Sequence, residues 1–158
     1  MAGKRKGLAA YNSRMNDPSL DYDPRYLAGI VLFNEREFFE AHEVWEDLWA
    51  ECGGPQRRFY QGLIQAAVAL LHFGNGNLRG AFKLYDSGQK YMLAFGSPFL
   101  GLDSAGFWQQ MERCFAEARA GGDPDRRYIP QEELIPVIRL EPPPAQWPDP
   151  AEFLAEED

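Results

Sequence analysis

The side chains best suited to chemistry lie within residues 33–50, whose sequence is FNEREFFEAHEVWEDLWA. His42 and Glu46 are four residues apart, so on a helix their side chains lie one turn apart on the same side. Glu43 follows His42 directly and lies further toward the solvated side. An imidazole beside a carboxylate can act in general acid–base catalysis. His42, Glu46 and Glu43 are therefore candidate catalytic residues.

A second polar group lies in residues 56–73, whose middle part is apolar on nearly all sides. The only polar side chains in that middle part are Gln61, Gln65 and His72, which fall within about 40° of one another on a helix. Such a stripe needs hydrogen-bond partners, because a buried polar group without one costs about 1–3 kcal/mol. These three residues are candidate binding residues.

The two polar groups can meet if their helices are antiparallel, as the short Gly-Gly-Pro connection between them predicts. Counting outward from that connection places Glu46 near Gln61 and His42 near Gln65, with His72 about two turns deeper. The sequence therefore predicts a shared polar seam, a buried His/Glu/Gln cluster, between two otherwise apolar helices.

Three interpretations of this seam remain open. Its polar groups can satisfy one another and fix the register of the helices, they can line a pocket for a small molecule, or they can bind a metal. His42, Glu46 and His72 would supply two imidazoles and one carboxylate, but the depth of His72 works against this set. A zinc-protease motif is absent, because Glu46 stands where the second His belongs. No metal ligands are assigned, and the cofactor stays unknown.

The elements that must position these residues are helices. Spacings of three and four residues put one set of side chains on a single buried face of residues 33–50: Phe38, Ala41, Trp45, Leu48 and Trp49. Trp45 and Trp49 are also candidate binding residues, although a role in the core is the simpler interpretation.

Helix boundaries follow from capping residues. Asp23-Pro24 predicts a helix start, and Asn34 with Glu37 resembles a capping box for the next helix. Further helices are predicted over about residues 56–73, from a cap at Asn77 to about residue 95, and from a cap at Asp103 or Ser104 to about residue 120. We expect an all-α fold, a compact bundle of about five helices built from two stacked helical hairpins.

Three regions of the chain differ in composition. Residues 1–20 lack periodicity and are predicted to be a flexible N-terminal arm. Residues 21–122 form the predicted helical domain. Residues 123–158 are expected to be a Pro-rich extended arm with an acidic tail, because seven of the twelve prolines lie between Pro130 and Pro150. Within them, residues 135–140 are expected to lie extended across the bundle or to form a short strand.

Composition excludes several classes of protein. The formal net charge of −8 and the isoelectric point near 4.8 argue against general binding to nucleic acid or to anionic membranes. No apolar run reaches the length of a membrane span or a signal peptide. Two cysteines without metal-type spacing do not make a disulfide framework. We expect a soluble, cytoplasmic protein with reduced thiols.

The strings FN-x-x-EFFEAHEVWEDLW and FYQGLIQAAVALLHF-x-x-GN together resemble the domain of unknown function 309 family, small all-helical proteins of bacteria, archaea and plastids. The resemblance covers roughly Tyr26 to Phe95. It implies a compact helical fold in which His42-Glu43, Glu46 and residues 62–65 are signature positions, and it implies no particular activity.

Two functional hypotheses follow. The first is a non-enzymatic interaction or structural module that self-associates or binds a protein partner through an exposed face of a helical hairpin. The second is a small-molecule-binding protein or hydrolase in which Glu46 acts as the base and His42 orients it, with or without a metal. The second requires a concave pocket that reaches these two side chains.

Overall fold

The computed structural model describes residues 22–123 and 125–154. Within these residues the chain forms five α-helices and two short 3-10 helices, and no strand longer than an isolated β-bridge. The elements are α3 (Pro24–Asn34), α4 (Phe38–Glu51), α5 (Gln56–Gly74), α6 (Leu78–Leu93), α7 (Ser104–Ala120), η1 (Glu132–Leu134) and η2 (Pro150–Phe153). The predicted all-α fold is confirmed. The predicted N-terminal arm, residues 1–20, lies outside the described residues.

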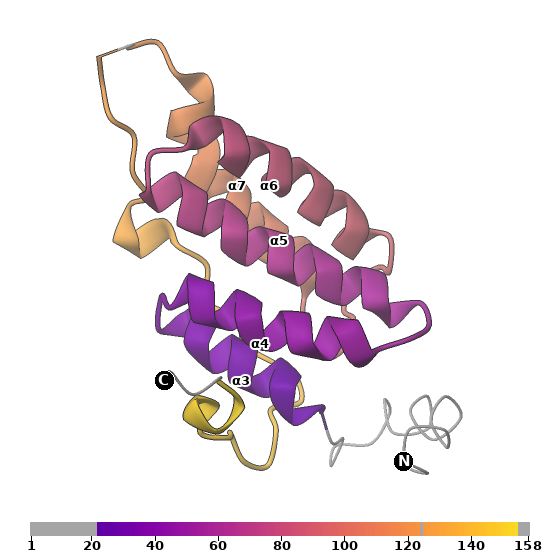
Figure 1. Ribbon diagram of the computed structural model, residues 1–158. Coiled ribbons are helices and arrows are strands. Elements are labelled where there is room, and N and C mark those ends of the chain that lie inside the picture. Colours follow the sequence, from indigo (N-terminus) through magenta and orange to yellow (C-terminus); the bar gives the residue numbers. More distant parts are fainter. Residues whose placement is uncertain (1–21, 124, 155–158) are drawn as a thin grey trace.

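The helices form two stacked hairpins (Figure 1). Helices α3 and α4 make the first hairpin, and α5 and α6 make the second, with α4 lying beside α5. Helix α7 covers the second hairpin from behind in this view. Short turns connect successive helices within each hairpin, which forces neighbours to be antiparallel. Because α5 packs between α4 and α6, it is the central helix of the bundle.

Side-chain caps define three of the helix starts. The Asp23 carboxylate accepts a 2.8 Å hydrogen bond from the Arg25 N–H, and Pro24 occupies the first turn of α3. Asn77 caps α6 by accepting from Gly80, and Asp103 caps α7 by accepting from Gly106, both at 3.0 Å. The cap predictions at Asp23 and Asn77 are confirmed. Of the two caps predicted for the last helix, Asp103 or Ser104, the structure has Asp103.

The capping box predicted at Asn34 and Glu37 is wrong. Helix α3 continues through Asn34, while Glu37 is the N-cap of α4 and makes no capping hydrogen bond with its side chain. The Asn34 carboxamide instead donates to the Ile138 C=O at 2.9 Å and accepts from the Ile138 N–H at 2.8 Å. A contact 104 residues away in the sequence has displaced the local capping interaction that the spacing suggested.

The first hairpin closes around Trp45. Its indole Nε1–H donates to the Tyr26 C=O at 3.2 Å, and its ring lies 6.0 Å from that of Phe33. Gly29 makes this approach possible, because a Cβ there would overlap the indole ring. The ring centroid of Phe33 also lies 5.8 Å from that of Phe107 in α7. One aromatic cluster therefore joins the first hairpin to the last helix.

Small residues bring α5 and α6 together. A Cβ added to Gly62 would lie 2.9 Å from the Gly88 C=O oxygen, and one added to Gly88 would lie 3.0 Å from the Gly62 C=O oxygen. The two backbones are therefore nearly in contact at this crossing. No larger residue fits at either position without moving a helix.

The chain after α7 crosses the bundle in extended form. Pro136, Ile138 and Leu140 turn inward and are buried, and Leu140 forms an isolated antiparallel bridge with Leu102. The Tyr22 hydroxyl donates to the Pro142 C=O at 2.6 Å. The expected extended path of residues 135–140 across the bundle surface is confirmed. Residues 132–144 are a part of the Pro-rich region predicted over residues 123–158. From here on, "the arm" means residues 132–144 alone.

Candidate functional site

The buried face of α4 is rotated about the helix axis relative to the face that the sequence predicted. Its buried side chains are Phe38, Ala41, Val44, Trp45 and Leu48, so Val44 has joined the core while Trp49 is only half-buried. The reason is that α4 packs against α3 as well as α5, which turns its apolar face toward the first hairpin. This rotation carries His42 and Glu46 outward.

His42 and Glu46 form the expected pair on α4. The His42 Nε2 lies 3.3 Å from a Glu46 carboxylate oxygen, and its Nδ1 lies 2.6 Å from the Phe39 C=O oxygen of the same helix. The Glu46 side chain is 54% exposed and that of His42 is 19% exposed. The expectation of a buried cluster is therefore wrong for Glu46. Glu43 is exposed one turn away from Phe39.

The polar stripe of α5 does not meet this pair through the expected hydrogen bonds. The Gln65 carboxamide oxygen accepts a 2.7 Å hydrogen bond from the Ser87 hydroxyl of α6. Gln61 and His72 are half-buried, and within the described residues no hydrogen bond links either to α4. The prediction that Gln65 lies in a polar seam shared with α4 is thus wrong, because the side of α5 that carries Gln65 faces α6.

The metal interpretation of the sequence finds no support in this geometry. Across residues 22–123 and 125–154, no three His, Cys, Asp or Glu side chains are close enough to hold a metal ion. His72 therefore does not join His42 and Glu46 as a third ligand. The His42–Glu46 pair by itself offers two ligands, fewer than structural or catalytic sites use.

The two tryptophans have different surroundings. Trp45 is fully buried and belongs to the core. Trp49 is half-buried, and the Arg57 guanidinium lies over its ring at 3.8 Å from the centroid. Arg57 also donates to the Trp49 C=O at 3.2 Å. In the described part of the chain the indole Nε1–H of Trp49 has no acceptor. Trp49 and Arg57 thus link the end of α4 to the start of α5.

Carboxylates crowd the outer face of α4. The helix has five acidic residues and no Lys or Arg. Partial burial raises the pKa of the Glu40 carboxyl, and the neighbouring carboxylates of Glu37 and Glu43 raise it further. Among them lies Phe39, whose side chain is 49% exposed and whose ring contacts the His42 imidazole at 5.1 Å. We call Phe39, Glu40, Glu43 and Glu46 the acidic face.

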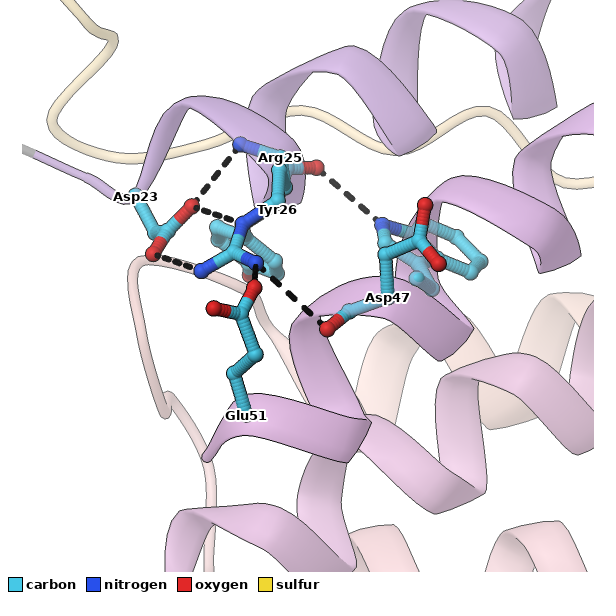
Figure 2. A network of polar contacts seen from close by, with 6 residues as sticks. Asp23, Arg25, Tyr26, Asp47 and Glu51 are labelled. Carbon is cyan, nitrogen blue, oxygen red and sulfur yellow. Dashed lines mark hydrogen bonds and ion pairs between the residues drawn. The ribbon is translucent and has the colours of Figure 1, made fainter. Parts of the chain in front are cut away.

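The opposite edge of α4 is tied to α3 by a polar network (Figure 2). The Arg25 guanidinium lies between the carboxylates of Asp23 and Glu51 and also donates to the Asp47 C=O at 3.4 Å. Burial opposes the Arg25 charge, but the two carboxylates prevail and raise its pKa above the ordinary value. The sequence analysis missed this network, because no short spacing signals a contact between α3 and the end of α4.

Two clefts of ligand size lie elsewhere in the described structure, and the candidate catalytic residues line neither of them. The larger, about 440 Å³, lies between α7 and the arm. The other, about 350 Å³, lies between the start of α3 and residues 144–148. Neither is lined by any of the sequence candidates, which are His42, Glu43, Trp45, Glu46, Trp49, Gln61, Gln65 and His72. The pocket required by the hydrolase hypothesis is not one of these two clefts.

Residues 26–84 match the domain of unknown function DUF309. The predicted family resemblance is confirmed over this segment, which holds nearly all of α3, the whole of α4 and α5, and the start of α6. The DUF309 segment contains every candidate residue named from the sequence. It excludes α7 and the arm, and with them the larger cleft.

Two relatives each match 61% of this chain. An uncharacterised protein of Bacillus subtilis, YpuF, is 32% identical over 100 residues, which are 61% of this chain and 58% of YpuF. An uncharacterised protein of Aquifex aeolicus is 27% identical over 97 residues, 61% of this chain and 29% of that protein. The chain thus spans less than two thirds of the length of either relative. No helix of the described residues is long and apolar enough to cross a membrane.

Proposed function

We propose that this protein is a non-enzymatic interaction module whose acidic face binds a Lys/Arg-rich segment of a partner protein. The observation that carries this proposal is a half-exposed Phe39 surrounded by carboxylates that no Lys or Arg neutralises in the described part of the chain. A basic segment with one apolar side chain complements both features. Phe39 would be its apolar anchor, and Glu43 and Glu46 would be its charged contacts.

Electrostatics supports this choice of partner. Burial is the largest cause of the raised pKa of Glu40, and the neighbouring carboxylates of Glu37 and Glu43 add to it. A bound cation would relieve the part that comes from repulsion between carboxylates. Covering the exposed part of Phe39 adds apolar burial at about 25 cal/mol per Å². Charges at the rim of an interface mainly raise the association rate and set specificity, so we expect binding that weakens strongly with salt.

The His42–Glu46 pair fits this role better than catalysis. Its carboxylate is more than half exposed, and it lines neither of the two clefts described above. Catalysis by a general base is favoured by a site that excludes water and orients substrate. In the proposed module His42 holds the Glu46 carboxylate at the rim of the acidic face, where it can contact a basic side chain.

The proposal is tested with a fluorescein-labelled amphipathic Lys/Leu peptide, with binding followed by anisotropy at about 0.05 M and about 0.5 M salt. Glu43→Lys should weaken binding at low salt by at least about tenfold. Glu112→Lys is the matched control, because Glu112 is exposed on α7 and the change in net charge is identical. Its effect should stay within about twofold.

A second variant tests the apolar anchor. Phe39→Ser should weaken binding at both salt concentrations, because lost apolar contact is not screened by salt. Equal losses in Glu43→Lys and Glu112→Lys would show that the peptide senses net charge alone and would overturn the proposal. Sedimentation of the free protein over a range of concentrations would show whether a second copy of the chain is the partner instead.

A further inference from the structure

The larger cleft is built from two elements that the DUF309 segment does not include. Its floor is apolar, with Leu102 and Phe107 each at most 3% exposed. Its rim carries polar groups from Gln110 of α7 and from Glu133 and Arg139 of the arm. At about 440 Å³ the cleft lies in the range of natural ligand sites, about 300–1,000 Å³.

The arm presents alternate residues to this cleft. Residues 133, 135, 137 and 139 line it, whereas Pro136, Ile138 and Leu140 are buried against the bundle. This period of two is that of a β-strand with one side packed and one side open. The hydrogen-bonding groups of such a segment point sideways, at right angles to both faces. In the described residues this segment has a backbone bridge to the loop before α7 only at its end, between Leu140 and Leu102.

The backbone N–H and C=O of Val137 make no hydrogen bond with another described residue. The Val137 side chain is 39% exposed. Successive residues of an extended chain direct these groups to opposite sides. Ile138 pairs with Asn34 on one side, and the Glu141 N–H donates to the Gly101 C=O, just before α7, on the other. Val137 has the same parity as Glu141, so its polar groups face the α7 side and the cleft.

The two ends of the cleft carry opposite charges. Arg139 and Glu133 both line it, and neither takes part in an ion pair with another described residue. The third charged residue, Asp103, is committed to capping α7 and accepts from the Gly106 N–H and the Ser97 hydroxyl. A ligand is thus offered one cation and one anion six residues apart along the arm, at most about 20 Å.

We infer that this cleft binds an extended peptide segment of a partner protein, which adds a strand to the arm. Its backbone pairs with the N–H and C=O of Val137, one of its apolar side chains lies against Phe107 and Ile135, and its charged ends meet Arg139 and Glu133. Adding a strand to an exposed edge is an established mode of peptide recognition. With a single paired residue we expect modest affinity, Kd about 0.1–1 mM.

The test uses the full chain and a blocked hexapeptide, acetyl-KVLVTE-amide, with binding followed by backbone-amide chemical shifts in NMR. Shifts should concentrate at Phe107, Gln110 and Val137. Val137→Pro removes the N–H that the peptide uses and should weaken binding by at least about fivefold. Val137→Ala keeps that N–H and is the matched control, expected to stay within about twofold.

Two further comparisons distinguish strand pairing from non-specific binding of the peptide. One peptide is methylated on the backbone nitrogens of its two Val residues, and another on those of Leu and Thr. Only one edge of a bound strand faces the arm, so one of these peptides should lose binding and the other should keep it. Arg139→Glu should weaken binding several-fold, whereas Arg113→Glu, at an exposed residue of α7 that does not line the cleft, should not.

The outcomes divide clearly. Equal binding by both methylated peptides, equal binding by Val137→Pro and Val137→Ala, or shifts confined to residues outside the cleft would each overturn the inference. Absence of any shift at a peptide concentration of about 5 mM would do so as well, because sites of the expected affinity would then be mostly filled. Each variant is checked for folding by its circular dichroism before the titration.

Discussion

Gly29 is the residue on which the packing of the first hairpin depends most directly. Adding a methyl group there puts Cβ inside the van der Waals contact of the Trp45 indole, and Trp45 is fully buried with its N–H bonded to Tyr26. Gly29→Ala should therefore destabilise the fold by about 1–3 kcal/mol or more, the usual cost of overpacking. Chemical denaturation measures the change. Gly53→Ala, with open space around it, should stay within about 0.5 kcal/mol.

Cys114 is expected to be chemically inert in the native protein. Burial in α7 raises the pKa of its thiol to about 11, so at pH 8 only about one molecule in a thousand carries the reactive thiolate. Ellman's reagent should react first with the half-buried Cys52 and reach Cys114 only on unfolding. Rapid reaction of two thiols in the native protein would contradict this.

The same shift predicts how stability depends on pH. The pKa of the Cys114 thiol in the folded protein lies above its reference value of 9.0. The contribution of the buried, neutral thiol to the free energy of unfolding is therefore fully present below pH 9. That contribution is lost as pH rises from about 9 to about 11, because the unfolded chain ionises first. A Cys114→Ala variant should lose less stability over this interval than the wild type does, as measured by urea denaturation.

At the scale of elements, Asn34 holds the arm to the end of α3. Its carboxamide satisfies both the N–H and the C=O of Ile138. Asn34→Ala should cost about 1–3 kcal/mol, since two polar groups of a partly buried segment lose their partner. Hydrogen exchange at the Ile138 amide should accelerate. Asn75→Ala, an exposed turn residue, is the control and should leave that amide protected.

Asn34 also shows where sequence reasoning ends. Asp23, Asn77 and Asp103 cap helices as predicted, because a cap depends on residues two or three positions away. Asn34 has the same local signal, and a contact 104 residues away overrides it. The helix order, the hairpins and the extended course of residues 135–140 were predictable from periodicity and breakers. The partner of Asn34 was not, because no local pattern encodes it.

The candidate site was predictable in part for the same reason. The spacing of His42 and Glu46 fixes their pairing on any helix, and the structure has it. The direction in which α4 turns its apolar face depends on α3 as well as α5, and one helical wheel does not contain that information. Val44 therefore entered the core, Glu46 moved into solvent, and Gln65 found Ser87 of α6.

At the scale of the molecule, the two hairpins share one core. The ring centroid of Tyr26 in the first hairpin lies 5.9 Å from that of Tyr60 in the second, and Phe33 of the first hairpin contacts Phe107 of α7. We therefore expect a single cooperative unfolding transition. Urea curves followed by tryptophan fluorescence and by helical circular dichroism should coincide. Separate midpoints for the two signals would show that the hairpins unfold independently.

The two hydrogen bonds between the Asn34 carboxamide and the Ile138 backbone also affect how the chain folds during its synthesis. Synthesis proceeds from the N-terminus, so the first hairpin exists well before residue 138 leaves the ribosome. Until then the side chain of Asn34 lacks the Ile138 backbone as its partner, and the end of α3 that the arm covers stays exposed to water. The bundle is thus sealed last by its own late-arriving segment, and a stalled or truncated nascent chain would display that uncovered surface to chaperones and proteases.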